Sequence, residues 1–174
     1  MTRVLGLAGW SGAGKTTLLS RLIPALRERG YSVSTLKHAH HTFDIDKPGK
    51  DSYLHREAGA SEVLVASSHR WALMHELRGA PEPRLGELLG RFSPVDFILV
   101  EGFKRDAHVK IEVHRAANGK SWLYPDDSSI GAVVSDVAPP SRLLPFVGLD
   151  DLDGIAGLVV DLAWPLDKTL AALA

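Results

Sequence analysis

The chain has 174 residues, of which 45% are hydrophobic and 24% charged, so one domain with a substantial core is expected. Its formal net charge of −1 provides no basic field that would attract nucleic acid or an anionic membrane surface. The absence of cysteine excludes disulfides, thiolate zinc sites and a cysteine nucleophile. No apolar run approaches the ~20 residues of a membrane-spanning helix and no signal peptide is evident, so we expect a soluble, cytoplasmic protein.

The most informative motif lies at the N-terminus, where residues 9–16 match G-x-x-x-x-G-K-[ST] at every fixed position. An apolar run at 4–8 precedes the motif and a helix-like segment at 17–29 follows it, which is the context of a phosphate-binding loop. Lys15 would reach the β- and γ-phosphates of a nucleotide, and the Thr16 hydroxyl would ligate Mg²⁺. The predicted nucleotide contacts are Gly9, Trp10, Ser11, Gly12, Ala13, Gly14, Lys15, Thr16 and Thr17.

A second strand, expected over residues 31–36, leads into Lys37-His38-Ala39-His40-His41. Neighbours at a strand end point to opposite faces, so we favour an anion-binding or partner-facing cluster over a metal site. A charged loop over 42–51 follows and ends at Asp51, beside a short helix expected from Ser52 to Gly59. Asp51 is a candidate to position water or to contact phosphate or metal, and solvated loop charge is the alternative.

The middle of the chain predicts a hairpin over 62–66 and 70–74, an amphipathic helix over 82–92 and a buried strand over 96–102. Glu101 lies at the carboxyl end of this strand, where ligands bind in open α/β sheets. A carboxylate there would hold Mg²⁺ through a water or orient the attacking water. An ordinary surface acid is the alternative interpretation of Glu101.

The strict alternation of Val109–His114 predicts a strand with one wet face. Asn118-Gly119 is typical of a hairpin turn, so a protruding β-ribbon is expected at about 108–125 within the single domain 1–174. A buried strand over 130–134 precedes Asp136, and a closing helix is expected over 152–162. A carboxylate accepts hydrogen bonds from N1–H and from the amino group of guanine, so Asp136 favours GTP over ATP. The usual guanine-binding signature, Asn-Lys-x-Asp, is absent from the chain.

Strands and helices alternate around the phosphate loop. This order predicts an α/β P-loop NTPase fold, with a mostly parallel sheet flanked by helices and a protruding hairpin.

Several segments resemble the molybdopterin-guanine dinucleotide biosynthesis protein B family (MobB). They are the loop Gly9–Thr16, Lys37–His41 with Phe43–Ser52, His55–Ala60, Val100–Lys104 and Lys110–Arg115. The resemblance implies a homodimeric GTP-binding protein with weak GTPase activity that assists the nucleotidyltransferase MobA in joining GMP to molybdopterin. It also implies Lys15 and Thr16 on phosphate and Mg²⁺, Glu101 as the second acidic element, and the strand around Ile111 in the dimer interface.

Two other functions are compatible with the same loop. The first is a binding module that uses the nucleotide to set a conformation or to recruit the transferase without required hydrolysis. The second is a small-molecule kinase, in which the His/Lys cluster and Arg115 would bind an acceptor. Molybdopterin is a possible further ligand, and neither nucleic acid nor membrane is expected as a partner.

Overall fold

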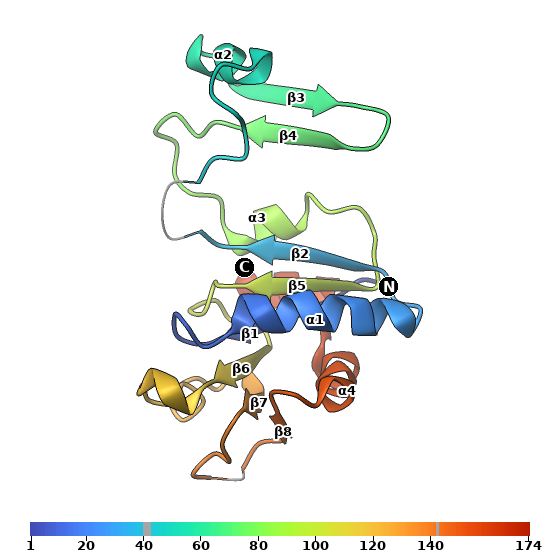
Figure 1. The fold of residues 1–174 in the computed structure, drawn as a ribbon, viewed down its shortest axis with the longest axis vertical. Coiled ribbons are helices and arrows are strands. Elements are labelled where there is room, and N and C mark those ends of the chain that lie inside the picture. The colour runs from blue at the N-terminus through green and yellow to red at the C-terminus, as the bar shows by residue number, and fades with distance from the viewer. Residues whose placement is uncertain (40–42, 142) are drawn as a thin grey trace. The chain divides into compact units, whose positions relative to one another are not determined.

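A computed structural model describes residues 1–39, 43–141 and 143–174, which form two compact units (Figure 1). Residues 1–38 and 85–174 form the first unit, and residues 39–84 form the second. Among the described residues, no helix combines the length and the apolar character needed to span a bilayer. The expectation of one domain over 1–174 stays a prediction.

The first unit is built on a mainly parallel sheet in the order β2-β5-β1-β6-β7-β8, with β9 antiparallel to β1. The central strand β1 pairs with β5 on one side and with β6 on the other. This sheet confirms the predicted α/β architecture. Its strands are β1 (Arg3–Ala8), β2 (Val33–Lys37), β5 (Phe97–Glu101), β6 (Lys110–His114), β7 (Ile130–Ser135), β8 (Phe146–Gly148) and β9 (Trp164–Pro165).

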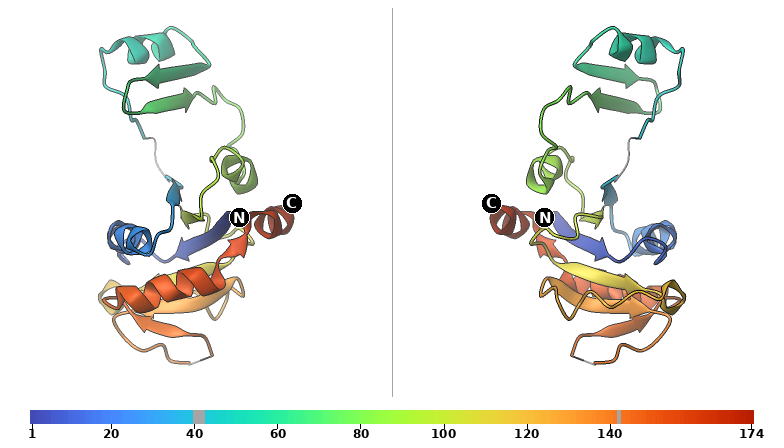
Figure 2. Two further views of the ribbon diagram at one scale, coloured as in Figure 1. Left: turned by 90° about the vertical axis from the view of Figure 1, so that its right-hand side faces the viewer. Right: turned by 90° about the vertical axis from the view of Figure 1, so that its left-hand side faces the viewer.

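Helices cover both faces of this sheet because consecutive apolar residues of each strand point to opposite faces (Figure 2). Leu5 and Leu7 of β1 pack in the core beneath α1 and α4, whereas Val4 joins the core beneath α3 and α5. The predicted closing helix over 152–162 is confirmed. The helices are α1 (Lys15–Glu28), α3 (Leu85–Leu89), α4 (Leu152–Leu162) and α5 (Leu166–Leu173).

The second unit consists of α2 (Asp51–Glu57) and an antiparallel hairpin of β3 (Glu62–Ala66) and β4 (Trp71–His75). The predicted hairpin is therefore confirmed. Val63 and Met74, which are cross-strand partners, are buried. The alternate positions are exposed, so the hairpin presents an apolar face formed by Leu64, Trp71 and Leu73.

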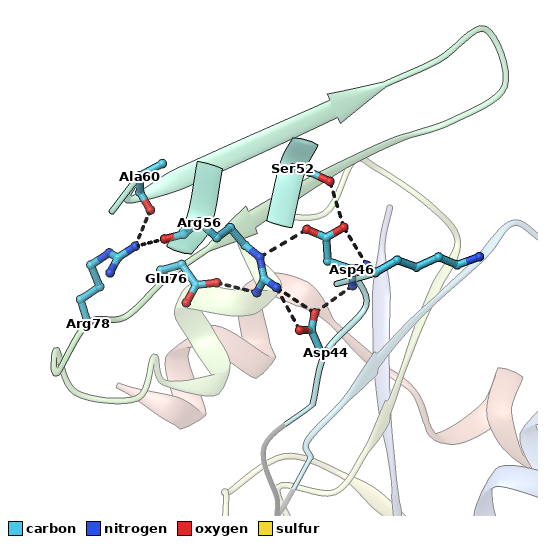
Figure 3. A network of polar contacts seen from close by, with 8 residues as sticks. Asp44, Asp46, Ser52, Arg56, Ala60, Glu76 and Arg78 are labelled. Carbon is cyan, nitrogen blue, oxygen red and sulfur yellow. Dashed lines mark hydrogen bonds and ion pairs between the residues drawn. The ribbon is translucent and has the colours of Figure 1, made fainter. Parts of the chain in front are cut away.

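A polar network centred on Arg56 of α2 holds the second unit together (Figure 3). The guanidinium donates to Asp44 at 2.9 Å and to Glu76 at 3.0 Å, and its Nε lies 3.4 Å from an Asp46 oxygen. Arg78 donates to the main-chain oxygen of Arg56 at 2.7 Å. The backbone N–H of Asp46 and the Arg56 guanidinium lower the pKa of Asp44. Much of the charge in the predicted loop therefore has a structural role.

The β-ribbon predicted at 108–125 is wrong, because β6 is buried and parallel to both β1 and β7. Its polar side chains are covered by the connection that follows it instead of by water. Glu112 accepts the backbone N–H groups of Leu123 and Tyr124, both at 2.8 Å, and the His114 ring stacks on Trp122 at 3.6 Å. Beyond β6 the chain forms a short 3-10 helix, Ala116–Asn118.

Candidate functional site

The segment between β1 and α1 is a tight loop whose glycines meet other parts of the backbone. A Cβ atom at Gly9 would overlap the carbonyl oxygen of Val113 in β6. Gly14 has a φ of 94° and caps the N-terminus of α1 in the left-handed conformation, which glycine adopts without steric cost. The loop therefore joins the carboxyl end of β1 to the positive end of a 14-residue helix, as an anion-binding loop requires.

Lys15, Thr16 and Glu101 lie together at the carboxyl ends of β1 and β5. The Thr16 hydroxyl donates to Glu101 Oε1 at 2.8 Å, and the Lys37 ammonium lies 3.9 Å from the same oxygen. The Lys15 ammonium donates to the carbonyls of Gly9 and Trp10 at 2.8 and 3.0 Å. Burial lowers the pKa of Lys15, and the Glu101 carboxylate opposes this effect.

Residues that follow β6 form a second flank of the loop. A Cβ atom at Gly14 would lie 3.5 Å from a guanidinium nitrogen of Arg115. Asn118 donates through Nδ2 to the Ser11 carbonyl at 3.0 Å. Asp136, at the end of β7, accepts the backbone N–H of Ala116 at 2.9 Å and is exposed. The predicted base-binding carboxylate is thus tied to the segment that flanks the phosphate loop.

Trp10 connects the loop to two further segments of the first unit. Its indole Nε1 donates to the Ser121 carbonyl at 2.8 Å, and the Lys104 ammonium lies 4.7 Å from the ring centroid. Thr17, the last predicted contact, is exposed in the first turn of α1. The roles assigned to the loop residues as nucleotide contacts stay predictions.

Asp51 belongs to the other compact unit, where it is the first residue of α2 and is exposed. Its assignment to catalysis or metal binding stays a prediction. Within the histidine cluster, His38 packs against Phe103 with ring centroids 4.7 Å apart, and His40 and His41 lie outside the described residues. Across the described ranges, no group of three or more His, Asp or Glu side chains is placed to hold a metal ion.

Sequence reasoning missed Asn118, Ser121 and Trp122 as neighbours of the loop. Asn118-Gly119 was interpreted as a hairpin turn, but the two residues close the 3-10 helix that follows β6. The strand order could have identified these residues. A strand parallel and adjacent to β1 ends at the same edge of the sheet as β1, so the connection that follows it begins next to the phosphate loop.

A glycine-rich loop between β1 and α1, with an acidic residue at the end of the neighbouring parallel strand, defines the P-loop α/β class. The family model for molybdopterin guanine dinucleotide synthesis protein B, MobB, matches residues 4–136. The chain therefore belongs to the MobB family.

Two curated relatives are especially similar. The molybdopterin-guanine dinucleotide biosynthesis adapter protein of Escherichia coli (strain K12) is 45% identical over 164 residues, which cover 92% of this chain and 93% of that protein. The protein of the same name from Haemophilus influenzae is 48% identical over 115 residues, covering 64% of this chain and 63% of its own length.

Solved structures agree with this assignment. A crystal structure of molybdopterin-guanine biosynthesis protein B superposes with a TM-score of 0.72 at 26% identity, over 91% of this chain and 99% of the other. The crystal structure of Bacillus subtilis MobB gives a TM-score of 0.71 at 22% identity, over 92% and 98% of the two chains, and shows the shared fold.

Proposed function

We propose that the chain is a GTP-binding adapter that hydrolyses GTP slowly and assists the attachment of GMP to molybdopterin. The observation that carries the nucleotide part is the cluster of Lys15, Thr16 and Glu101 at the carboxyl ends of adjacent parallel strands. The part that concerns molybdopterin rests on the names of the relatives, which are called biosynthesis adapter proteins.

The loop suits a triphosphate in both charge and shape. Lys15 would exchange the carbonyls of Gly9 and Trp10 for the β- and γ-phosphates, since an ammonium prefers anionic acceptors. Arg115, placed beside Gly14, would add a second cation on the opposite flank of the loop. Two positive side chains and the helix terminus would then face the tetraanionic tail.

The donor set also fits Mg²⁺. Thr16 Oγ1 and Glu101 Oε1 are hard oxygen ligands 2.8 Å apart, and Mg²⁺ in nucleotide sites is held by one or two protein oxygens together with phosphates. The ion would neutralise charge that develops on the transferred phosphoryl group. Thr16 would hold it directly, and Glu101 would hold it through a water or would orient the attacking water.

Guanine specificity rests on Asp136. Its carboxylate is exposed at the end of β7, and the Ala116 N–H that it accepts fixes one of its oxygens. A carboxylate pairs with the N1–H and the amino group of guanine, whereas adenine presents an acceptor beside a donor at this edge. The Asp136 carboxylate would therefore suit guanine better than adenine.

Calorimetric titration with GTP and with ATP, each with Mg²⁺, tests the proposal. We expect tighter binding of GTP, loss of binding in Lys15→Ala, and loss of the preference for GTP in Asp136→Ala. Asp161→Ala is the control, because Asp161 is an exposed carboxylate on α4. Equal affinity for both nucleotides, or a preference for ATP, would contradict the assignment of guanine.

Activity assays distinguish this proposal from two alternative functions, a binding module and a small-molecule kinase. If Lys15→Ala leaves the rate of hydrolysis unchanged but abolishes complex formation with the transferase MobA, the chain is a nucleotide-dependent binding module. If GDP or ADP forms in a burst only when an acceptor is added, it is a small-molecule kinase.

We also propose that the chain forms a homodimer, as the family resemblance implies. The strand first assigned to the interface, β6, is buried inside the sheet and is unavailable. The apolar face of Leu64, Trp71 and Leu73 supports another location, because these side chains are 61%, 68% and 46% exposed. Analytical ultracentrifugation of Leu64→Glu should show a monomer. A wild-type protein that sediments as a monomer at micromolar concentration would contradict the proposal.

A further inference from the structure

A cavity of about 460 Å³ adjoins the phosphate loop in the first unit. Three segments line it, namely the loop, the connection between β5 and β6, and the connection between β6 and β7. This volume lies within the range of small-molecule sites, which is about 300–1,000 Å³. The lining residues that matter for recognition are Trp10, Lys104, Arg105, Trp122, Asp126 and Asp127.

The two tryptophans are held in place by their neighbours. Trp10 is fixed by the hydrogen bond from its indole to the Ser121 carbonyl, and Trp122 is stacked on the buried ring of His114. Indole rings fixed in this way provide surfaces on which a planar heterocycle can stack at low entropic cost. The chemistry of the walls therefore favours a flat, aromatic ligand.

The charged residues of the cavity are of two kinds. Lys104 and Arg105 are exposed cations that would attract an anionic substituent. Asp127 is engaged with the buried Lys110 at 3.5 Å and with Ser129. Asp126 is exposed, and among the described residues its carboxylate has neither a hydrogen-bond nor an ion-pair partner. It is thus the acceptor that a ligand with adjacent N–H donors would meet.

A buried cation, Lys110, holds one of the residues that line the cavity, Asp127. Lys110 of β6 is 1% exposed, and its ammonium donates to the Asp106 carbonyl at 2.6 Å as well as to the Ser129 hydroxyl. These bonds tie the two connections that line the cavity to the same strand. The walls are therefore positioned by the core of the sheet, as a preorganised site requires.

The residues assigned to the nucleotide base do not line the cavity. Asp136 and Ala116, which meet at the ends of β7 and β6, are not among its lining residues. A guanine held by Asp136 would consequently leave the cavity available for a second ligand while the triphosphate occupies the loop.

We propose that this cavity binds a second ligand, a 2-amino-4-oxo heterocycle of the pterin type with an anionic side chain, at the same time as the nucleotide. The ring would stack on the tryptophans, its N3–H and 2-amino group would donate to Asp126, and the anionic side chain would lie near Lys104 and Arg105. This inference deepens the proposed function, because it rests on the role in molybdopterin chemistry. Guanine carries the same 2-amino-4-oxo edge, so the experiment must separate the two sources.

The probe is 6-carboxypterin, a fluorescent pterin with a carboxylate, titrated at pH 7 into the full chain and followed by fluorescence polarisation. We expect binding both without nucleotide and with saturating GTP and Mg²⁺. Asp126→Asn should weaken it about tenfold or more, because an amide can accept only one of the two donated hydrogen bonds. Lys104→Ala should weaken it severalfold. Asp161→Asn and Lys120→Ala are matched controls at exposed positions outside the cavity and should leave it unchanged.

Each contrary outcome of the 6-carboxypterin titration contradicts a different part of the proposal. Competition between GTP and 6-carboxypterin, or equal binding of guanosine in the presence of GTP, would assign the cavity to the nucleotide base. Equal affinities of Asp126→Asn and the control variants, or no binding by the wild type, would refute the site. Lys15→Ala separates the two proposals, because it should abolish GTP binding and preserve 6-carboxypterin binding. If the wild type binds 6-carboxypterin but not GTP, the nucleotide part of the proposed function and simultaneous binding both fail, whereas the assignment of the cavity to a pterin-type ligand stands.

Discussion

His108 makes the stability of the chain depend on pH in a way that follows from its position. The residue belongs to the connection from β5 to β6, its side chain is fully buried beside Gly6 of β1, and neither ring nitrogen has a hydrogen-bond partner among the described residues. Burial, helped by the nearby Lys110 ammonium, lowers the pKa of His108 from 6.5 to about 4. The folded protein therefore holds a neutral imidazole at a pH at which the unfolded chain would bind a proton.

Below about pH 6.5 the unfolded state binds more protons than the folded state, so the free energy of unfolding falls as the pH falls. The loss develops between pH 6.5 and about pH 4 and levels off below that range, where both states are protonated. A pKa difference of this size corresponds to a total of about 3 kcal/mol.

Urea unfolding, measured by circular dichroism at several pH values from 4.5 to 7.5, provides the test. His108→Met replaces the imidazole with a flexible apolar side chain that does not titrate, so the slope of unfolding free energy against pH should decrease over this window. His69→Met, at an exposed turn of the hairpin, should keep the wild-type slope. Equal slopes for wild type and His108→Met would show that His108 is hydrated or charged in the folded protein and would refute the reasoning.

Three further substitutions probe other parts of the structure. Thr16→Val removes the hydroxyl that donates to Glu101, so the Mg²⁺-dependent part of GTP affinity should fall about tenfold in calorimetry. Lys110→Met leaves Asp127 without its buried cation and should lower the free energy of unfolding by about 3 kcal/mol in urea denaturation. Arg56→Met removes the centre of the network in the second unit, so thermolysin should cleave residues 43–84 severalfold faster.

Each of these substitutions has a matched control. Thr16→Ser keeps the hydroxyl and should retain most of the effect of Mg²⁺ on GTP affinity. Lys120→Met removes an exposed cation and should change stability by no more than about 0.5 kcal/mol. Arg70→Met alters an exposed arginine next to β4 and should leave cleavage by thermolysin at the wild-type rate. A control that behaves like its partner would contradict the corresponding prediction.

Local patterns in the sequence predicted those helices and strands whose own residues show the periodicity or the apolar run of the element. The apolar run before Glu101 predicted a buried strand, and the segment 152–162 was predicted as the closing helix, which is α4. The pattern of β6 failed because its polar residues face the connection that follows the strand, which folds back over it. Glu112 is satisfied by backbone groups of Leu123 and Tyr124, and a periodicity rule assigns such a residue to water.

Some residues of the candidate site could likewise be predicted from the sequence, and others could not. Lys15 and Thr16 belong to a contiguous motif, and Glu101 ends a recognisable strand, so the three could be named from the sequence. Trp122 and Asp126 lie in a connection without a local signature. Only the tertiary arrangement shows that this connection reaches the cavity beside Trp10. A site composed of loops is determined by the scaffold that brings them together.

The position of β1 in the middle of the sheet has a consequence for synthesis on the ribosome. Arg3 pairs with Phe97 and Gly6 with Lys110, so β1 must wait for partners that are synthesised much later. Pairing between residues so distant in sequence folds slowly, because the intervening chain must first be closed into a loop. The first residue of α5 is also needed, since Leu166 donates its backbone N–H to the Thr2 carbonyl. The phosphate loop that follows β1 is therefore among the last parts of the molecule to assume its final shape.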